Sequence, residues 1–467
     1  MPFQPVLLWS DLLLWLLLAC AIGLGIVSAR TPHLRRAWSR LGRNGVAMAV
    51  ATLLTAFLLV GLLDSLHYRE RLPPAPGQTG TVYGVEVLSV LDGLLTHLRS
   101  RNEKTYSAPF ATRLYAKESM ETPAGTVRDY PRLKHGGAHL GDDETKRDAD
   151  VMQRAFAGKV QAFLIWLGLA GGLAALLARR QGCSHQEAWR AIWRGETAIA
   201  WRGVLLALGG LLLVFLPLAL LAGDYHVFGT DKVGQDVFYQ VLKSIRTALV
   251  IGLVTTLVTL PLAVVLGIVA GYFRGWADDV IQYIYTVLNS IPGVLLIAAA
   301  VLMMQVVIDT RPQWFATAAE RADLRLLALC VILGMTSWTG LARLLRGETL
   351  KLRELEYIQA ARAFGVSSGR IIGRHILPNL MHIVVIALVM DFSSLVLAEA
   401  VLSYVGIGVD PTMISFGTMI NNARMELGRE PVVWWSLAAA FVFMFVLVLS
   451  ANLFADAVRD AFDPRLD

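Results

Sequence analysis

The sequence has little charge and few cysteines. Charged residues make up only 17% of the 467 residues, against about a quarter in an ordinary soluble domain, whereas hydrophobic residues make up 55%. A water-soluble or disordered chain of this length needs more polar side chains, so both classes are excluded. The three cysteines, Cys20, Cys183 and Cys330, have no metal-ligand spacing and do not support a disulfide framework. The composition therefore predicts a polytopic membrane protein.

The sequence also lacks the motifs of common catalytic sites. It contains no G-x-x-x-x-G-K-[ST] phosphate loop, no H-E-x-x-H zinc motif and no G-x-S-x-G nucleophile motif. We therefore expect no catalytic or metal-binding residues, no enzyme activity and no ATP hydrolysis by this chain alone. The 42 Lys and Arg residues against 36 Asp and Glu give a net charge of +6, which is too small to indicate a nucleic-acid partner.

Nine apolar runs are long enough to cross a bilayer. A spanning helix needs roughly 20 apolar residues, and these runs are too long and too continuous to be barrel strands. The runs cover residues 12–29, 46–63, 160–178, 203–223, 247–273, 280–308, 326–342, 380–405 and 431–455. They predict an all-α polytopic membrane protein with about nine transmembrane helices. The runs that contain Pro261 and Pro292 are expected to be kinked or to lie partly outside the hydrocarbon.

The orientation follows from the basic residues in three short loops. Arginine and lysine gather in residues 30–43, 179–202 and 343–374. With nine spans these loops lie on one side, which the positive-inside rule makes the cytoplasm. The N-terminus is then outside and the C-terminus inside. The run that ends at Cys20 faintly resembles a lipoprotein cleavage site, but no basic residue precedes it, and we expect a retained helix.

One long polar stretch, residues 67–159, is predicted to lie outside. Its part from Leu72 to Gly77 reads as a linker, and residues 82–98 suit a short strand and a helix. The remainder predicts a small domain or an ordered hairpin extension. In its turn-rich part, His135 and His139 are followed by Asp142 and Asp143, a possible set of metal ligands. Because the surrounding residues are glycine-rich, we interpret this part as a solvated loop instead.

Two G-x-x-x-G motifs lie inside apolar runs. They are Gly168 to Gly172 and Gly267 to Gly271. Such spacing lets two helices approach closely. Ordinary packing within the chain and a dedicated subunit interface both remain open for each motif.

The cytoplasmic stretch from Glu348 to Asn379 is long, basic and amphipathic. Leu355, Ile358, Ala361 and Phe364 recur at helical spacing, and Gly365 follows as a residue that tolerates positive φ. A second helical segment covers residues 370–376, and Pro378 begins the next spanning helix. Two short helices joined at a glycine suit docking into a groove of a soluble partner. The alternative is a helix resting on anionic lipid.

This stretch resembles the EAA loop of ABC-importer permeases through Ala360-Ala361, Gly365 and Leu377-Pro378. More broadly, residues 224–467 resemble the second permease subunit of dipeptide and oligopeptide ABC importers. The further matching segments are 226–236, 402–409, 415–417, 434–435 and 459–466. Gln359 stands where the family has the Glu that names the motif, and Gln235 stands where it usually has Arg.

We expect four parts in a bacterial cytoplasmic (inner) membrane protein, of which the apolar runs and the polar stretch indicate the first three and the resemblance implies only the last. They are two N-terminal transmembrane helices (1–66), the external polar domain (67–159), a third extra helix with a cytoplasmic linker (160–202), and a six-helix permease core (203–467) with its EAA coupling loop at 346–379. The first three parts form an atypical N-terminal extension.

The resemblance also implies partners and a mechanism. An external solute-binding protein delivers substrate to a cavity shared with a second permease subunit, and two ABC ATPase subunits, which hold ATP and Mg, drive alternating access. This chain itself binds no cofactor. The implied ATPase-coupling residues are Glu356, Ile358, Gln359, Ala360, Ala361, Arg362, Phe364, Gly365, Leu377 and Pro378. Of these, Phe364 and Ile358 are expected to anchor the partner, with Glu356 and Arg362 at the rim. The external motif comprises His226, Gly229, Thr230, Asp231, Gly234 and Asp236.

Asp391 and Glu399 are candidates for the translocation path. They lie eight residues apart in one apolar run, hence on roughly the same helix face. Charges at membrane depth usually face protein or water. They either line the cavity and meet a peptide's amino terminus or pair with another helix, and pairing is favoured for Glu399.

The substrate is predicted to be a di- or oligopeptide. The alternatives are nickel or another small solute, or a membrane scaffold or sensor with a degenerate transporter core. The intact spacing of the EAA loop argues against degeneration, whereas Gln359 argues for it.

Overall fold

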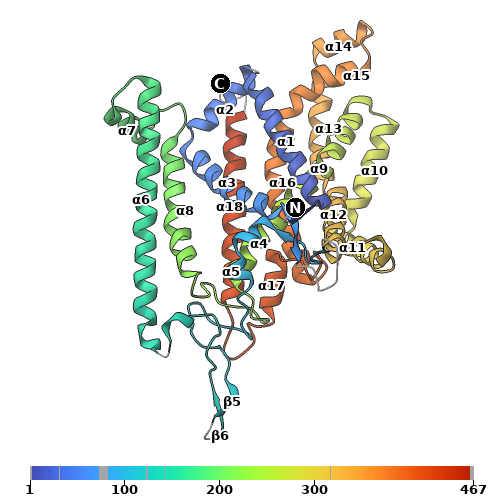
Figure 1. Ribbon diagram of the computed structural model, residues 1–467. Coiled ribbons are helices and arrows are strands. Elements are labelled where there is room, and N and C mark those ends of the chain that lie inside the picture. The colour runs from blue at the N-terminus through green and yellow to red at the C-terminus, as the bar shows by residue number, and fades with distance from the viewer. Residues whose placement is uncertain are drawn as a thin grey trace. The chain divides into compact units, whose positions relative to one another are not determined.

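The computed structural model describes residues 3–30, 32–72, 82–122, 125–141, 143–315 and 317–462 (Figure 1). Within these residues the chain forms two compact units. The first combines residues 3–7, 27–248 and 414–457, and the second combines residues 8–26, 249–413 and 458–462. Helices dominate both units, so the predicted all-α class is confirmed.

The first unit contains the extension, the external segment and the last helix. Its helices are α2 (Pro32–Arg43), α3 (Gly45–Asp64), α4 (Val90–Leu94), α5 (Thr96–Arg99), α6 (Arg147–Gln181), α7 (His185–Arg194), α8 (Trp201–Leu221), the start of α9 (Val237–Phe273), α17 (Phe416–Arg424) and most of α18 (Trp435–Phe462). Its strands are β1 (Phe3–Val6), β2 (His67–Leu72), β3 (Val82–Tyr83), β4 (Leu88–Ser89), β5 (Glu118–Thr122) and β6 (Gly125–Asp129).

The second unit contains most of the transporter-like helices. These are most of α1 (Trp9–Arg30), the remainder of α9, α10 (Trp276–Ser290), α11 (Gly293–Asp309), α12 (Ala318–Ser337), α13 (Thr339–Arg353), α14 (Glu356–Ala363), α15 (Ser368–Ile371) and α16 (Leu377–Val405). A π-helical turn, Ile372–Ile376, joins α15 to α16.

The number of spans differs from the predicted nine. In the described part of the chain, seven helices are long and apolar enough to cross a membrane, namely Gly45–Asp64, Glu144–Gln181, Trp201–Leu221, Val237–Phe273, Ala318–Arg353, Ser368–Val405 and Trp435–Phe462. The run 280–308 is a pair of helices, α10 and α11, bent by 90°, and it raises the number to eight if it counts as one span. The first run lies in α1, whose apolar part Trp9–Gly23 is shorter than a full span.

The 90° bend has a local cause. Ile291, the residue before Pro292, takes an extended conformation at the end of α10. Proline disfavours helical geometry in the residue before it and cannot donate a backbone hydrogen bond. The predicted kink at Pro292 is therefore confirmed, and it is sharp enough to break the run into two helices. Pro261 lies inside the continuous helix α9.

Two parts of the external stretch form the secondary structure that the sequence predicted. Residues 82–98 contain short strands followed by α4, whose N-terminus is capped by a reciprocal Ser89–Asp92 capping box. Strands β5 and β6 form an antiparallel hairpin, labelled at the bottom of Figure 1. β1 pairs with β2, so the N-terminal strand lies on the same side as the external stretch. The predicted linker falls largely outside the described residues.

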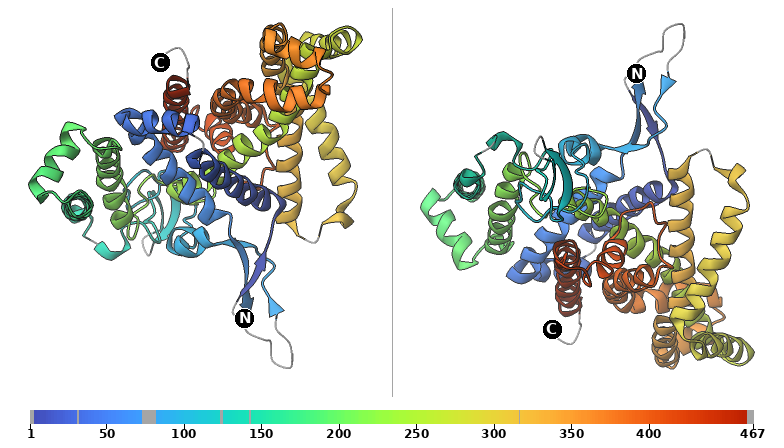
Figure 2. Two further views of the ribbon diagram at one scale, coloured as in Figure 1. Left: turned by 90° about the horizontal axis from the view of Figure 1, so that it is seen from above. Right: turned by 90° about the horizontal axis from the view of Figure 1, so that it is seen from below.

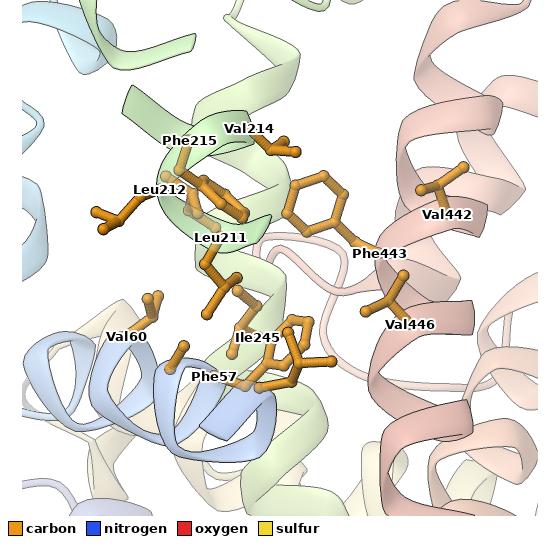
Figure 3. Close-up of a pocket in the computed structure, with 13 residues that line it drawn as sticks. Phe57, Val60, Leu211, Leu212, Val214, Phe215, Ile245, Val442, Phe443 and Val446 are labelled. Atoms are coloured by element: carbon orange, nitrogen blue, oxygen red, sulfur yellow. The ribbon is translucent and has the colours of Figure 1, made fainter. Parts of the chain in front are cut away.

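The extension helices of the first unit pack around α8. In Figures 1 and 2, α6, α7 and α8 lie side by side, and α3 also packs against α8. Gly158 lies close to Pro217, and Gly203 lies against the backbone of Gly45. A cavity of about 360 Å³ separates α3, α8, α9 and α18, and thirteen apolar side chains line it (Figure 3).

The two G-x-x-x-G motifs behave differently. In the second unit, a Cβ added at Gly267 would lie 2.7 Å from the carbonyl oxygen of Ala342, and one at Gly271 would lie 2.6 Å from Cβ of Thr349. This motif therefore packs α9 directly against α13 of the same chain. At Gly168 and Gly172, no described atom lies within 4 Å of an added Cβ.

Candidate functional site

The predicted coupling segment forms two short helices joined at a glycine. α14 ends at Ala363, and Gly365 follows with a φ of 75°. The N–H of Val366 donates to the carbonyl of Ala361 at 3.1 Å, which closes the helix end. Positive φ favours glycine, because a Cβ strains this conformation. The predicted helix and its glycine end are therefore confirmed.

The second half of the segment also follows the sequence. The predicted helical residues 370–376 lie in α15 and the π-helical turn, and Pro378 lies in the first turn of α16. Proline is tolerated there because a first-turn N–H has no partner within the helix. Asn379 donates from its amide nitrogen to the carbonyl of His375 at 2.7 Å. The segment is thus tied into the start of a long helix.

The apolar face of α14 is divided between the interior and the surface. Ile358 is only 2% exposed and packs in a cluster with Ile371 and Ile376. Phe364 is 87% exposed. The expectation that Ile358 anchors a partner is corrected, because its side chain already fills the core of this unit. Phe364 remains available for a contact.

Gln359 has a defined partner within the coupling segment. Its Nε2 donates to the carbonyl of Glu354 at 3.1 Å and lies 3.4 Å from the carboxylate of the same residue. That carboxylate also pairs with Arg274 at 3.0 Å. An amide can donate to Glu354, whereas a carboxylate at position 359 could only accept and would repel it. Gln359 therefore forms hydrogen bonds with Glu354 that the Glu of the family could not form at this position.

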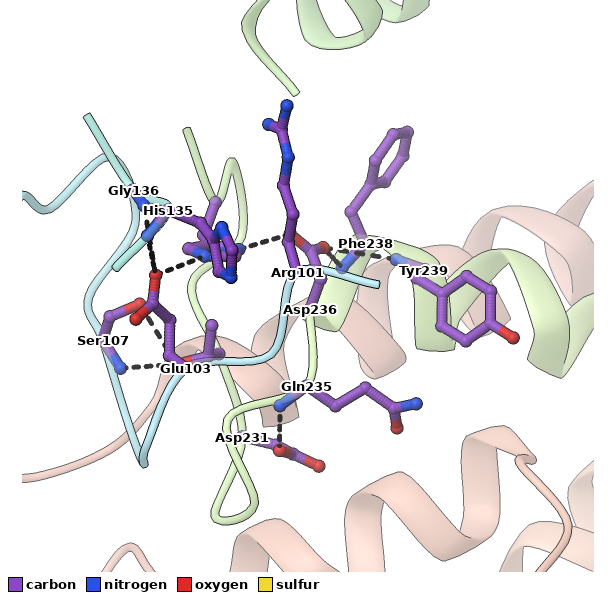
Figure 4. A network of polar contacts seen from close by, with 12 residues as sticks. Arg101, Glu103, Ser107, His135, Gly136, Asp231, Gln235, Asp236, Phe238 and Tyr239 are labelled. Carbon is purple, nitrogen blue, oxygen red and sulfur yellow. Dashed lines mark hydrogen bonds and ion pairs between the residues drawn. The ribbon is translucent and has the colours of Figure 1, made fainter. Parts of the chain in front are cut away.

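The external motif is centred on His226 in the first unit. Its Nδ1 lies 2.7 Å from Asp236 Oδ2, and its Nε2 lies 3.3 Å from Glu103 Oε1 (Figure 4). All three side chains are almost completely buried. Burial alone would lower the pKa of His226, but its hydrogen bonds with the two carboxylates raise it to about 9. The imidazole is therefore a cation between two anions at neutral pH.

Glu103 comes from the external stretch and is held by consecutive backbone groups. Its carboxylate accepts hydrogen bonds from the N–H groups of Lys134, His135 and Gly136 at 2.8, 2.7 and 3.1 Å. Burial would raise the pKa of Glu103, but the bonds from His226 and from these N–H groups hold it at about 2. Glu103 was not predicted as part of this site, because no local pattern links it to a histidine 123 residues away.

The other residues of the motif also contact the external stretch or close its turn. Thr230 Oγ1 accepts from the N–H of Ser107 at 2.7 Å, and Gly229 and Gly234 have positive φ where a Cβ would collide with the backbone of Ser107 and Glu103. Asp231 Oδ1 accepts from the N–H of Gln235 at 2.8 Å. The motif and the external stretch thus form one packed structure.

The histidine-containing part of the external stretch is only in part the solvated loop that the sequence suggested, because Lys134, Ala138 and His139 are exposed but the glycines between them are not. Gly136 and Gly137 are buried, and His139 Nε2 lies 2.8 Å from Asp150 Oδ2. The loop is ordered because its N–H groups bind Glu103 and its side chains meet α6. Asp142 lies outside the described residues, and the described part of the chain contains no group of three or more ligating side chains placed to hold a metal ion.

A second charged cluster was also missed. Lys243 Nζ lies 2.6 Å from Asp64 Oδ1 and 3.1 Å from Asp92 Oδ2, and Tyr239 donates to Asp92 at 2.7 Å. These residues join α3, α4 and the start of α9. The external stretch therefore contacts α9 at two separate places, through Glu103 and the external motif and through Asp92.

Known proteins resemble this chain over its second half. Residues 263–467 match the family described as "Binding-protein-dependent transport system inner membrane component". The oligopeptide transport system permease protein OppC of Mycobacterium tuberculosis is 33% identical over 242 residues, which are 52% of this chain and 77% of that protein. The chain belongs to this family of transport permeases.

Two further relatives agree with this assignment. The glutathione transport system permease protein GsiD of Pectobacterium atrosepticum is 32% identical over 243 residues, covering 52% of this chain and 73% of that protein. The dipeptide transport system permease protein DppC of Bacillus subtilis is 28% identical over 302 residues, covering 60% and 86%. The permease is thus a multi-pass inner-membrane component of an ABC importer, and its predicted class is confirmed.

The two acidic residues of the permease's α16 have different surroundings. Glu399 is buried, and Ser403 Oγ of the same helix donates to it at 2.6 Å. Asp391 is only half-buried. The partner shown for Glu399 lies on its own helix, so its predicted pairing with another helix and the predicted place of Asp391 on the translocation path stay predictions.

Proposed function

We propose that this permease imports di- or oligopeptides as one of two permease subunits, driven by two ABC ATPase subunits and supplied by an external solute-binding protein. The observation that carries the proposal is the preformed coupling segment with Phe364 exposed at its corner. A rigid helix pair that presents one aromatic side chain suits a groove in a soluble partner. Glu356 and Arg362 lie on the same short helix and would orient the contact.

The proposed substrate follows from the relatives, whose names state oligopeptide, glutathione and dipeptide transport. Asp391 is proposed to meet the amino terminus of a peptide in the translocation path. This chain is proposed to hold no cofactor, with ATP and Mg bound by the ATPases.

The proposed orientation places the coupling segment in the cytoplasm and the external motif outside. The basic residues in α2, in α7 and in the stretch 343–374 support it through the positive-inside rule. The N-terminus would then be outside and the C-terminus inside, which requires α1 and the bent pair α10 and α11 to cross the membrane in addition to the seven long helices.

The test compares Phe364→Asp with Val85→Asp in the complete transporter. Both side chains are largely exposed, 87% and 84%, so neither change should prevent folding. We expect Phe364→Asp to abolish co-purification of the ATPases and uptake of radiolabelled trialanine, while Val85→Asp retains both. Retention of both properties by Phe364→Asp would overturn the coupling role.

The same assay separates the alternative functions. Uptake of radiolabelled nickel without uptake of trialanine would favour the small-solute transporter. Absence of any ATPase from the purified wild-type complex would favour a scaffold or sensor. The matched arrangement of Gln359 with Glu354 argues against the scaffold, because it preserves the segment's structure without the family's Glu.

A further inference from the structure

The external stretch touches the permease core through a continuous line of polar contacts. The N–H groups of residues 134–136 donate hydrogen bonds to the carboxylate of Glu103. His226 forms ion pairs with Glu103 through one ring nitrogen and with Asp236 through the other. Asp236 Oδ1 in turn accepts from the N–H groups of Phe238 and Tyr239 at 2.8 and 3.3 Å. Asp236 therefore caps the first turn of α9, and the line of contacts ends on that helix (Figure 4).

This line of polar contacts depends on the positive charge of His226, which lies between the buried carboxylates of Glu103 and Asp236. With His226 protonated, each carboxylate has a charged partner at hydrogen-bonding distance. With His226 neutral, it can donate from only one nitrogen, and two carboxylates are left close together in a buried place. The other titratable or charged groups that face this cluster are His97, Arg101, Lys134 and His135. Arg101, Lys134 and His226 act electrostatically on His135, and Arg101 and Asp236 act on His97.

The helix that is fixed in this way is a principal element of the permease. α9 is continuous from Val237 to Phe273, and near its other end Gly267 and Gly271 pack against α13.

We propose that Glu103 is a positioning residue for transport, which fixes the first turn of α9 through His226 and Asp236. The external stretch is then a working part of the permease and not a separate appended domain. The transport readout rests on the proposed function, whereas the structural readout described below does not.

The contacts imply a direction of pH dependence. The pKa of His226 is raised from 6.5 to about 9, so its contribution to stability is complete below 6.5 and is lost as the pH rises through 9. The pKa of Glu103 is lowered from 4.5 to about 2, so its contribution is complete above 4.5 and is lost as the pH falls through 2. The line of contacts is therefore strongest between about pH 4.5 and 6.5 and weakens on the alkaline side.

The experiment compares Glu103→Gln with Glu118→Gln. Glu118 lies in the same external stretch and pairs with Lys104 at 2.6 Å, but that ion pair is on the surface and does not involve the external motif. Right-side-out membrane vesicles carrying the complete transporter are assayed for trialanine uptake between pH 6.5 and 9.5. In parallel, limited proteolysis of the external stretch is measured over the same range.

We expect Glu103→Gln to move the alkaline midpoint of uptake and of protease resistance down by about one unit, because one of the two carboxylates that favour the charged histidine is gone. Glu118→Gln should match the wild type. A merely structural role for Glu103 would lower the amount of transporter without moving the midpoint, and an unmoved midpoint in both assays would overturn the proposal.

A double-mutant cycle with His226→Gln tests whether Glu103 acts through the histidine. Glu103→Gln should have little further effect on protease resistance in the His226→Gln background, whereas additive losses would contradict the proposal. If the wild type takes up no trialanine, the proposed substrate is wrong. The shift in protease resistance still decides the role of Glu103 in that case.

Discussion

Replacing Gly271 of α9 by alanine should lower the stability of the folded permease, whereas replacing Gly172 of α6 by alanine should not. Gly271 and Gly172 each end a G-x-x-x-G motif in a long apolar helix. A Cβ at 271 would lie 2.6 Å from Cβ of Thr349 and 2.8 Å from the carbonyl oxygen of Arg346. At 172 no described atom lies within 4 Å of the new Cβ. Sequence spacing alone makes the two positions equivalent, and the structure makes them different.

The magnitudes follow from two opposing effects. Replacing glycine by alanine inside a helix favours the helix by up to about 1 kcal/mol at both positions. Forcing an extra carbon into a packed interface costs about 1–3 kcal/mol, and this applies only at 271, where α13 must move away from α9. Gly271→Ala should therefore be about 1–3 kcal/mol less stable than Gly172→Ala. Relative to the wild type, Gly172→Ala should be neutral or stabilising.

The assay is heating of the purified protein in detergent, followed by measurement of the fraction that remains monodisperse. The transition should occur at a lower temperature for Gly271→Ala than for the wild type, and at the same or a higher temperature for Gly172→Ala. Equal transitions for the two variants would refute the close packing of α9 on α13. A loss confined to Gly172→Ala would reverse the assignment of the two motifs.

Three further outcomes are expected. Ile358→Asp should abolish recovery of folded protein from membranes, unlike Phe364→Asp, because it places a charge in the core of the unit; equal yields would contradict the burial of Ile358. Arg325→Gln should lower the free energy of unfolding by about 3–5 kcal/mol, because it removes the guanidinium that lies 2.5 Å from the buried carboxylate of Asp410. An unchanged thermal transition of the purified protein in detergent would show that this ion pair is dispensable. Asp391→Asn should reduce trialanine uptake at normal expression, and unchanged uptake would remove Asp391 from the translocation path.

The parts of the fold that the sequence predicted depend on local chemistry. The helix that ends near Gly365 and the helix start at Pro378 follow from residues whose backbone preferences act within one turn. The break at Pro292 was expected for the same reason. Hydropathy also located the long helices, but it measures the length of a run and not its path. It therefore counted the bent pair α10 and α11 as one kinked span, and it counted α1, whose apolar part is Trp9–Gly23, as a full one.

The candidate sites were predicted less completely, because side-chain partners come from distant parts of the chain. Helical spacing placed Ile358 and Phe364 on one face. Only the tertiary structure decides that Ile358, in α14, is buried and that Phe364, which follows the helix, is exposed. The family's external motif was recognised from its own residues. Its partner Glu103 was not, because nothing near Glu103 in the sequence marks it.

The sequence by itself determined that this protein lies in a membrane and where its long apolar helices run, and it predicted which segment suits a soluble partner. Scarce charge, long apolar runs and a few glycines and prolines are sufficient for this, because they act on the backbone locally. Only the tertiary structure decided which glycines bring helices together, which apolar side chain remains exposed, and that the external stretch is fastened to α9. These features depend on the space and the charges that segments distant in the sequence supply, so no local sequence pattern predicts them.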